Sequence, residues 1–288
     1  MLKEWPLVAF TILGQTAVGL FWFFHLPFLA VGRAPGPGWR ASWLIILGLV
    51  TALMALATLA SIFHLHHPFR ARRALGNLRT SWLSREILFD LAFLALVASV
   101  AAAGAFGSPG PGLRWALLAA GGAAGGLFLM SMTELYMLPT VPAWRGVSTP
   151  LAFLGTTLVA GAVVTELAVR LVAGPGVFPI DLTLIAAVLI AGEIALTGLS
   201  GSGPERRGVR PAPSLRPPAP PRLVLHRIRP GLLAAGLVFI VIDRASGSNN
   251  IMNERGAGPA LWLAFVFVLA AEVVGRFLFY GLVPRSGD

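Results

Sequence analysis

Several side chains that can exchange protons or form hydrogen bonds occur at the ends of long apolar segments of this chain. His64 ends one such segment, Glu86 begins the next, and Asp90 follows one helical turn after Glu86. Residues at this spacing lie on one face of a helix. Tyr136 ends a later segment, and Gln15 lies inside the first one. An imidazole, two carboxylates, a phenol and an amide can together bind the oxygen atoms of a ligand and accept its protons.

The apolar segments that carry these residues indicate an all-α, polytopic integral membrane protein. Of 288 residues, 56% are hydrophobic and only 12% are charged. About twenty apolar residues cross a hydrocarbon core roughly 30 Å thick, and they must be helical because lipid offers no partners to backbone N–H and C=O groups. We predict one membrane domain over residues 1–288 with eight transmembrane helices, at about 5–31, 41–65, 82–106, 112–137, 149–173, 179–200, 229–247 and 258–281. The Pro/Arg-rich segment 202–228 is predicted to be an extended linker.

The predicted topology brings the polar side chains together. The second and third spans are antiparallel neighbours, so His64 and Glu86 are expected at a similar depth near the membrane surface. Tyr136 lies at the same surface, and Gln15 can reach it from the core. Apolar walls with a few convergent polar groups are typical of a site for a lipid-soluble ligand. A quinol fits this chemistry, because its oxidation releases two protons that Glu86 and His64 can accept or relay.

The intramembrane charges also allow other interpretations. A proton-coupled secondary transporter would use acids within the spans as relay groups, and a purely structural anchor would need no ligand. The acids concerned in the first case are Glu86, Asp90, Glu134 and Glu193. Four acids lie within or near span ends, where the default is snorkelling to the surface or a bond between helices: Glu134, Glu166, Glu193 and Asp243. Glu272 and Arg276 share a face of the last span and are interpreted as a structural pair.

The residue types limit the cofactors that this protein can hold. The absence of cysteine excludes disulfides, thiolate-bound iron–sulfur clusters and cysteine-linked haem. A bis-histidine haem needs two histidines at matching depth on facing helices, whereas His25 lies well inside the first span and His64 ends the second. We therefore expect no haem, no iron–sulfur cluster and no metal site on this chain.

The net charge of +10 comes almost entirely from arginine and is unevenly distributed. With eight spans both termini lie on one side, together with the arginine-rich loops 66–81, 138–148 and 202–228. Cytoplasmic loops are enriched in basic residues, which places the termini in the cytoplasm. Anionic lipid head groups or an acidic partner subunit explain the charge. Nucleic acid does not, because the basic residues sit in loops between spans.

Short motifs at helix ends and in loops follow one another in a recognisable order. They are Glu4-Trp5-Pro6-Leu7, Phe63-His64-Leu65 followed by Pro68 and Arg70, Leu83-Ser84-Arg85-Glu86-Ile87, Thr140-Val141-Pro142-Ala143-Trp144, Ser148-Thr149-Pro150, and Glu272-Val273-Val274-Gly275-Arg276 with Phe279-Tyr280-Gly281. In these motifs, which cover most of its length, the protein resembles the membrane anchor subunit of the dimethyl sulfoxide reductase family of molybdoenzymes. Their order and spacing carry the resemblance, because generic membrane helices do not share loop motifs.

The resemblance implies an eight-helix subunit that binds menaquinol and passes electrons to an iron–sulfur subunit with four 4Fe–4S clusters. A molybdopterin catalytic subunit then reduces the terminal acceptor in anaerobic respiration. This chain would thus hold a quinol-oxidation site and not the catalytic centre of the complex. His64 and Glu86 match the family's quinol-site residues, and Arg70 matches its basic position. His66 and His67 stand in a stretch where the family usually has a small residue. The implied location is the cytoplasmic (inner) membrane of a bacterium or archaeon.

Overall fold

The structure, a computed structural model, is helical throughout most of the residues that it describes. These are residues 5–31, 39–64, 75–107, 110–137, 144–173, 178, 180–200, 220–247 and 256–281. The elements are α1 (Trp5–Val31), α2 (Arg40–His64), the short 3₁₀-helix η4 (Leu75–Asn77), α4 (Trp82–Phe106), α5 (Pro111–Tyr136), α6 (Ser148–Ala173), α7 (Leu182–Ser200), α8 (Pro220–Gly247) and α9 (Pro259–Tyr280). The predicted fold of eight long helices in a polytopic membrane protein is confirmed.

Seven of these helices have the length and apolar composition needed to cross a membrane, and α7 has a shorter apolar stretch, Leu182–Thr197. Most helix ends lie close to the expected span boundaries, but α8 begins earlier than expected. Residues 220–228 are helical and extend α8 into the segment predicted as linker. Proline is tolerated in the first turn of a helix, because the N–H that it lacks has no partner there. The prolines at 220 and 221 therefore start a helix instead of preventing one.

Local signals in the sequence explain where several helices start. Ser81 precedes α4, and its hydroxyl accepts a hydrogen bond from the backbone N–H of Ser84 at 3.3 Å. Asp181 does the same for α7, accepting from the N–H of Leu184 at 2.9 Å. Pro111 and Pro259 occupy the first position of α5 and α9. The start of α4 is further fixed by Arg85, which donates to the carbonyl oxygens of Leu78 and Arg79, both at 2.8 Å.

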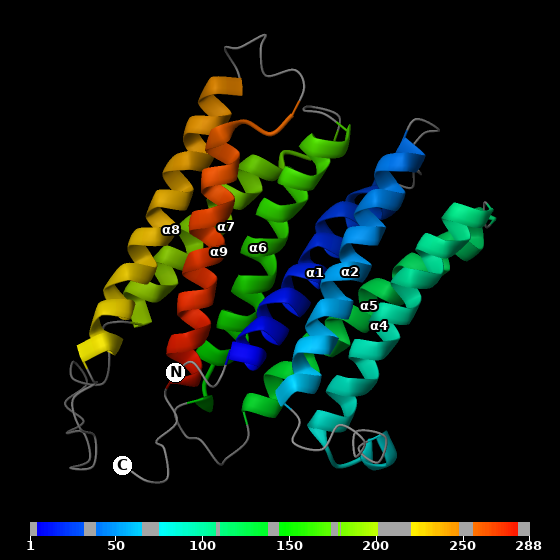
Figure 1. The fold of residues 1–288 in the computed structure, drawn as a ribbon, viewed down its shortest axis with the longest axis horizontal. Coiled ribbons are helices and arrows are strands. Elements are labelled where there is room, and N and C mark those ends of the chain that lie inside the picture. The colour runs from blue at the N-terminus through cyan, green and yellow to red at the C-terminus, as the bar shows by residue number, and fades with distance from the viewer. Residues whose placement is uncertain are drawn as a thin grey trace.

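The helices form two halves that meet along α1 and α6 (Figure 1). The first half comprises α1, α2, α4 and α5, and the second comprises α6, α7, α8 and α9. In an 18-residue apolar stretch of α1 and in one of α6, 72% of the residues are buried, whereas the value for α8 is 17%. Helices α1 and α6 therefore form the centre of the bundle. The backbones of α1 and α6 touch where Gly19 crosses Gly161, since a Cβ added to Gly161 would lie 2.5 Å from the Cα of Gly19. Small residues permit this approach of two membrane helices.

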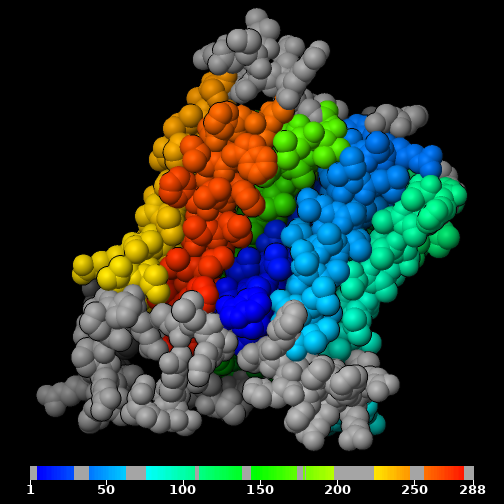
Figure 2. Space-filling view, in the orientation of Figure 1, coloured from blue at the N-terminus to red at the C-terminus, as the bar shows by residue number. Residues whose placement is uncertain are grey.

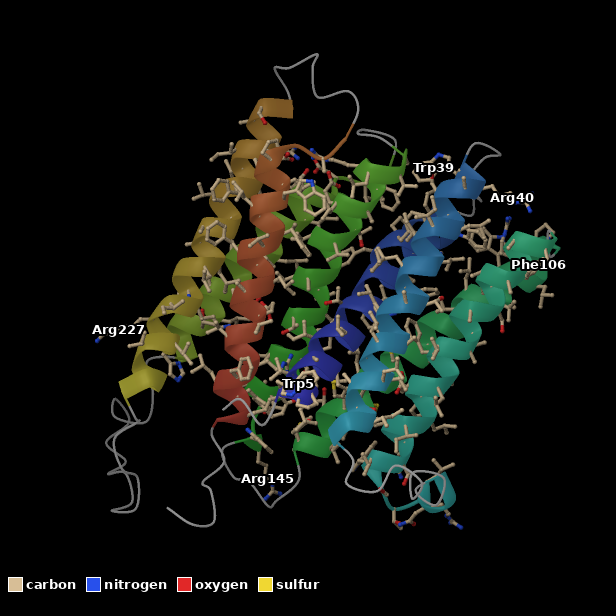
Figure 3. All side chains as sticks on the ribbon, viewed as in Figure 1. Trp5, Trp39, Arg40, Phe106, Arg145 and Arg227 are labelled. Atoms are coloured by element: carbon tan, nitrogen blue, oxygen red, sulfur yellow. The ribbon has the colours of Figure 1, made fainter. Side chains whose placement is uncertain are left out.

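The two ends of the bundle differ in the residues that they present. Trp5 and Arg145 lie at one end, and Trp39, Arg40 and Phe106 lie at the other (Figure 3). The first of these, which we call the Glu86 end, carries the start of α4 and the ends of α2, α5 and α9. Near it, the first turns of α1 lie between α9 and α2 in the space-filling view (Figure 2), and side chains of α1 pack against Tyr280 of α9. The other end is called the Phe106 end.

Candidate functional site

Glu86 and Asp90 are both buried inside the first half of the bundle. Each is only 4% exposed, and both lie on the inner face of α4. Asp90 accepts a hydrogen bond from the hydroxyl of Thr58 on α2, with an oxygen–oxygen distance of 2.8 Å. Glu86 has a buried oxygen, Oε1, that finds no hydrogen-bond partner among the described residues. Neither acid has a described cation within ion-pair distance. An acid in this state inside a membrane protein is a candidate for function.

The bond between Thr58 and Asp90 fixes the register of α2 against α4, and with it the height of His64. From Thr58 to His64 the helix rises about 9 Å, and from Asp90 back to Glu86 about 6 Å. The backbone of His64, the last residue of α2, therefore lies about 3 Å nearer the membrane surface than that of Glu86. The side chain of His64 lies outside the part that the structure describes, as do His66, His67 and Arg70. Their predicted roles stay predictions.

Five buried or half-buried polar residues converge at the Glu86 end, and we call them the polar cluster: Gln15, Glu86, Tyr136, Arg276 and Tyr280. The hydroxyl of Tyr280 lies 3.0 Å from that of Tyr136, and one guanidinium nitrogen of Arg276 donates to the amide oxygen of Gln15 at 2.6 Å. Glu86 lies within electrostatic range of both phenols. Side chains from α1, α4, α5 and α9 thus meet at one depth.

Arg276 connects this cluster to the second half of the bundle. Besides Gln15, it donates to the hydroxyl of Thr156 on α6 at 3.1 Å, and its guanidinium carbon lies 4.1 Å from the ring centre of Phe153. Thr156 in turn donates to Glu272 at 2.5 Å. Among the described residues Glu272 and Arg276 form no direct ion pair, so the pairing expected from their spacing is wrong. Both side chains instead bind the threonine that lies between them.

The structure brings together a second group of charged side chains, close to Arg276. The sequence did not predict that they form a group. Arg229 of α8 forms an ion pair with Glu193 of α7, and one of its nitrogens lies 3.8 Å from Glu272 of α9. The expected start of the seventh span puts Arg229 at the boundary of the predicted linker. A helix that starts at Pro220 instead carries Arg229 well into the bundle, where its side chain is 16% exposed. The residues before Arg229, 223–228, mix apolar and basic side chains, as an amphipathic helix does.

The charges at the Phe106 end are paired in the same way. Arg170 of α6 lies 2.5 Å from Glu166 and 2.8 Å from Asp243 of α8. At the surface, Asp181 pairs with Arg244. Partial burial acts to raise the pKa of Asp181, but hydrogen bonds from Arg244 and from the N–H of Leu184 outweigh it and lower that pKa to about 2.

The histidine inside the first span also lies towards the Phe106 end, far along its helix from the polar cluster. His25 is 1% exposed, and its Nδ1 lies 2.9 Å from the carbonyl oxygen of Phe21 in its own helix. It therefore does not share the depth of His64, at the end of α2. Among the described residues, no group of three or more histidine and acidic side chains is placed to hold a metal ion.

The polar cluster has the chemistry of a site for a head group with two oxygens. Phenols and a guanidinium donate hydrogen bonds, and a buried carboxylate without a counter-ion can take up a proton. Aromatic rings surround these groups, with Tyr136 lying 5.3 Å from Trp144 and 5.5 Å from Phe153 between ring centres. Of the residues predicted for the site, Gln15, Glu86 and Tyr136 meet here, while Asp90 lies one turn deeper. Tyr280 and Arg276 complete the group, although the sequence did not assign either to it.

Comparison with known proteins identifies the family. Residues 1–282 match the family model of the DMSO reductase anchor subunit (DmsC). The protein belongs to this family. It is 32% identical over 295 residues to the YnfH subunit of anaerobic dimethyl sulfoxide reductase from Escherichia coli K12, with 99% of this sequence and 96% of the relative covered. It is 28% identical over 287 residues to the C subunit of anaerobic dimethyl sulfoxide reductase from the same bacterium, covering 99% and 96%.

A relative from Haemophilus influenzae Rd, also the C subunit of an anaerobic dimethyl sulfoxide reductase, is 26% identical over 296 residues, with 99% and 97% covered. No solved structure matches the sequence. The resemblance seen in the motifs is thus confirmed over the whole length. The protein is a membrane anchor subunit, and an anchor of this complex implies partner subunits that carry catalysis and electron transfer.

Proposed function

We propose that this anchor oxidises menaquinol at the polar cluster and passes the electrons to an iron–sulfur subunit with four 4Fe–4S clusters. A molybdopterin-dependent catalytic subunit then uses them to reduce a terminal acceptor such as dimethyl sulfoxide in anaerobic respiration. Each quinol gives up two electrons and two protons. The two electrons leave to the partner subunit, and the two protons are taken up by Glu86 and by Asp90, one turn deeper. Tyr136, Tyr280 and Arg276 hold the oxygens of the head group.

The observation that carries the proposal is the state of Glu86. Its carboxyl group is buried, has an oxygen without a described hydrogen-bond partner and has no described counter-ion. Stability alone does not explain such a group, because an unpaired buried acid costs free energy. It lies beside two phenols at the end of the bundle where α2 ends with His64. We assign His64 to the same head group and Arg70 to its rim, as their family positions imply.

Glu86→Gln tests the proposal directly. The variant keeps the shape of the side chain and removes the proton acceptor, so quinol-dependent turnover of the intact complex should fall about 100-fold or more. Assembly with the partner subunits, followed by co-purification, should not change. Asp181→Asn is the control, because it also neutralises a carboxylate, but in an exposed pair at the Phe106 end, far from the polar cluster. Normal quinol oxidation in the Glu86 variant would reject the assignment.

His64→Ala tests the second member of the site. Loss of the imidazole should weaken binding of a quinol-analogue inhibitor about tenfold, which is the value of one hydrogen bond to a buried ligand. Tight binding in a fluorescence or inhibition titration, equal to that of the unchanged complex, would remove His64 from the pocket.

The location proposed for the complex is the cytoplasmic membrane, with both termini of this subunit in the cytoplasm. Arginines at the Glu86 end support this orientation, and Arg79 and Arg145 are exposed there. Because the sequence contains no cysteine, single cysteines can report its orientation. Arg145→Cys should resist a membrane-impermeant maleimide in intact cells, whereas Phe106→Cys, at a position 94% exposed, should react. The reverse pattern would invert the orientation.

A proton-coupled transporter is the alternative function. The buried charges of α7, α8 and α9 are the feature that could suggest it. Intramembrane acids can serve as proton relays, but Glu193 and Glu272 both lie within 4.0 Å of a nitrogen of Arg229, which is the arrangement of a structural ion pair. Purification from membranes separates the two functions. An anchor co-purifies with iron–sulfur and molybdenum subunits, and a transporter is obtained alone or as a homo-oligomer.

A further inference from the structure

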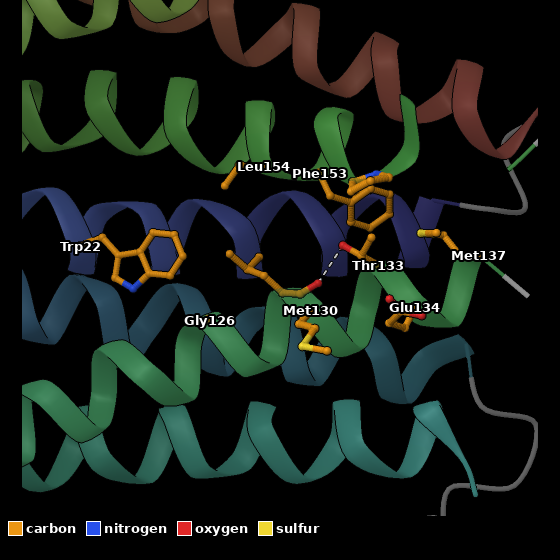
Figure 4. Close-up of a pocket in the computed structure, with 10 residues that line it drawn as sticks. Trp22, Gly126, Met130, Thr133, Glu134, Met137, Phe153 and Leu154 are labelled. Atoms are coloured by element: carbon orange, nitrogen blue, oxygen red, sulfur yellow. Dashed lines mark hydrogen bonds between the residues drawn. The ribbon is translucent and has the colours of Figure 1, made fainter. Parts of the chain in front are cut away.

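A groove of about 380 Å³ runs along the seam between α5 and α6 (Figure 4). Helix α5 packs mainly on α4, and α6 packs mainly on α1, so the two helices that border the groove contact each other little. Its walls are largely apolar and include Trp22, Gly126, Met130, Met137, Phe153 and Leu154. None of the residues predicted for the site lines it. The groove is therefore a feature of its own.

The groove opens towards lipid. Met130 and Leu154, one on each bordering helix, are 52% and 44% exposed on the surface that faces the membrane. Its floor is fixed, because the indole nitrogen of Trp22 donates to the carbonyl of Gly122 at 3.1 Å. Gly126 faces this indole, and a Cβ there would meet Trp22 at 3.6 Å. The absence of a side chain at Gly126 keeps the inner part of the groove open.

The groove ends beside the polar cluster. Phe153 forms part of its wall, and the same ring lies 4.1 Å from the guanidinium carbon of Arg276 and 5.5 Å from the ring of Tyr136. Met137, which directly follows Tyr136, lines the groove as well. A single aromatic ring thus contacts both the apolar groove and two members of the polar cluster. A molecule with a polar head and a long apolar tail matches this order of surfaces.

We propose that the α5–α6 groove is the lateral entrance to the polar cluster and holds the isoprenoid tail of the quinol. The inference rests on the proposed oxidation of quinol at that cluster. The head group enters from the bilayer between α5 and α6 and passes Phe153, and the first isoprene units then remain in the groove. Burial of the tail against Trp22, Met130 and Leu154 supplies affinity. The hydrogen bonds at the polar cluster set the orientation of the head group.

Gly126→Leu tests this assignment, because the new side chain fills the groove without touching the polar cluster. For a menaquinol with its full isoprenoid tail, kcat/KM of the intact complex should fall about tenfold, the equivalent of roughly two methylene groups that lose their burial. For a naphthoquinol without a tail, kcat/KM should stay within about twofold. Gly112→Leu is the control. It lies on the same helix, does not line the groove, and a Cβ there would meet nothing within 4 Å.

Each other outcome has a distinct meaning. If the Gly126 variant kept the activity of the unchanged complex with both quinols, the inference would be overturned, and the groove would be a site for membrane lipid. An equal loss with both quinols would overturn it too, because the groove would then shape the head-group site or the fold. If the unchanged complex oxidised neither quinol through this subunit, the proposed function itself would fail, whatever the groove holds.

Photo-crosslinking gives a second measurement that does not depend on turnover. A menaquinone with a diazirine in its second isoprene unit, irradiated with the purified complex, should label residues 126–137 or 150–154. Labelling confined to α2 and α4 would place the tail on the other side of the bundle and overturn the assignment.

Discussion

The two halves of the bundle differ in whether their buried acids are paired with cations. In the second half, Glu166, Glu193, Asp243 and Glu272 are at most 9% exposed, and each lies within 4.0 Å of an arginine nitrogen. In the first half, Glu86 and Asp90 are equally buried, yet no described cation lies within that distance of either. A buried acid without a cation beside it is costly to keep ionised. The second half thus pairs its acids with arginines, whereas the first half leaves its two buried acids without a described cation, as the role proposed for Glu86 requires.

The junction between the halves should be the position most sensitive to substitution. Gly161→Leu forces a side chain into the space occupied by the backbone of Gly19, and neither helix can yield without separating the halves. We expect the folded anchor to be lost from the membrane, as measured by its amount after solubilisation in mild detergent. Gly48→Leu is the control, because a Cβ at Gly48 meets nothing within 4 Å. A stable Gly161 variant would show that the halves do not depend on this crossing.

The second-largest loss of stability is expected when a cation is removed from the second half. Arg229→Met leaves Glu193 and Glu272 buried without their partner, which should cost about 3–5 kcal/mol of stability. Thermal unfolding of the purified complex measures the loss. Arg227→Met, two residues away at an exposed position, is the control. A variant at Arg229 that kept normal stability but lost quinol oxidation would place function in the second half and break the contrast between the halves.

The smallest effect is expected for the exposed pair of Asp181 and Arg244. Their side chains are 42% and 49% exposed, so solvent screens the pair and Asp181→Asn should cost less than about 1 kcal/mol. Because the folded state lowers the pKa of Asp181 to about 2, its contribution is present above the ordinary carboxyl pKa and is lost as the pH falls towards 2. Unfolding temperatures of the variant and the unchanged protein should differ slightly at pH 7 and converge near pH 2. A difference that grows in acid would contradict this.

The fold could be predicted well from the sequence because hydropathy is a strong local signal. The helix ends follow from features within a few residues, such as Ser81 and Pro259. The start of α8 was misplaced because proline and arginine were taken to indicate a loop, although proline fits the first turn of a helix. Because of that error, Arg229 was placed at the boundary of the predicted linker, and its pairing with Glu193 was not predicted.

The site could be predicted only in part. The positions of Glu86, Tyr136 and Gln15 at one end of the bundle follow from topology. The roles of Arg276 and Thr156 depend on the rotation of α6 and α9 about their axes, which hydropathy does not determine when a helix is apolar on most faces. The spacing of Glu272 and Arg276 indicated a pair within one helix, but it could not reveal that Thr156 lies between them.

Arg276 has a consequence for the biogenesis of the anchor. It belongs to α9, which follows the other described helices in the sequence, and it donates to Gln15 of α1 and Thr156 of α6. A nascent polypeptide that has inserted its first seven long helices already contains Glu86 but lacks both Arg276 and Tyr280. The polar cluster is therefore completed only after α9 has been inserted, so an anchor truncated before α9 would leave Glu86 without Arg276 and Tyr280 beside it.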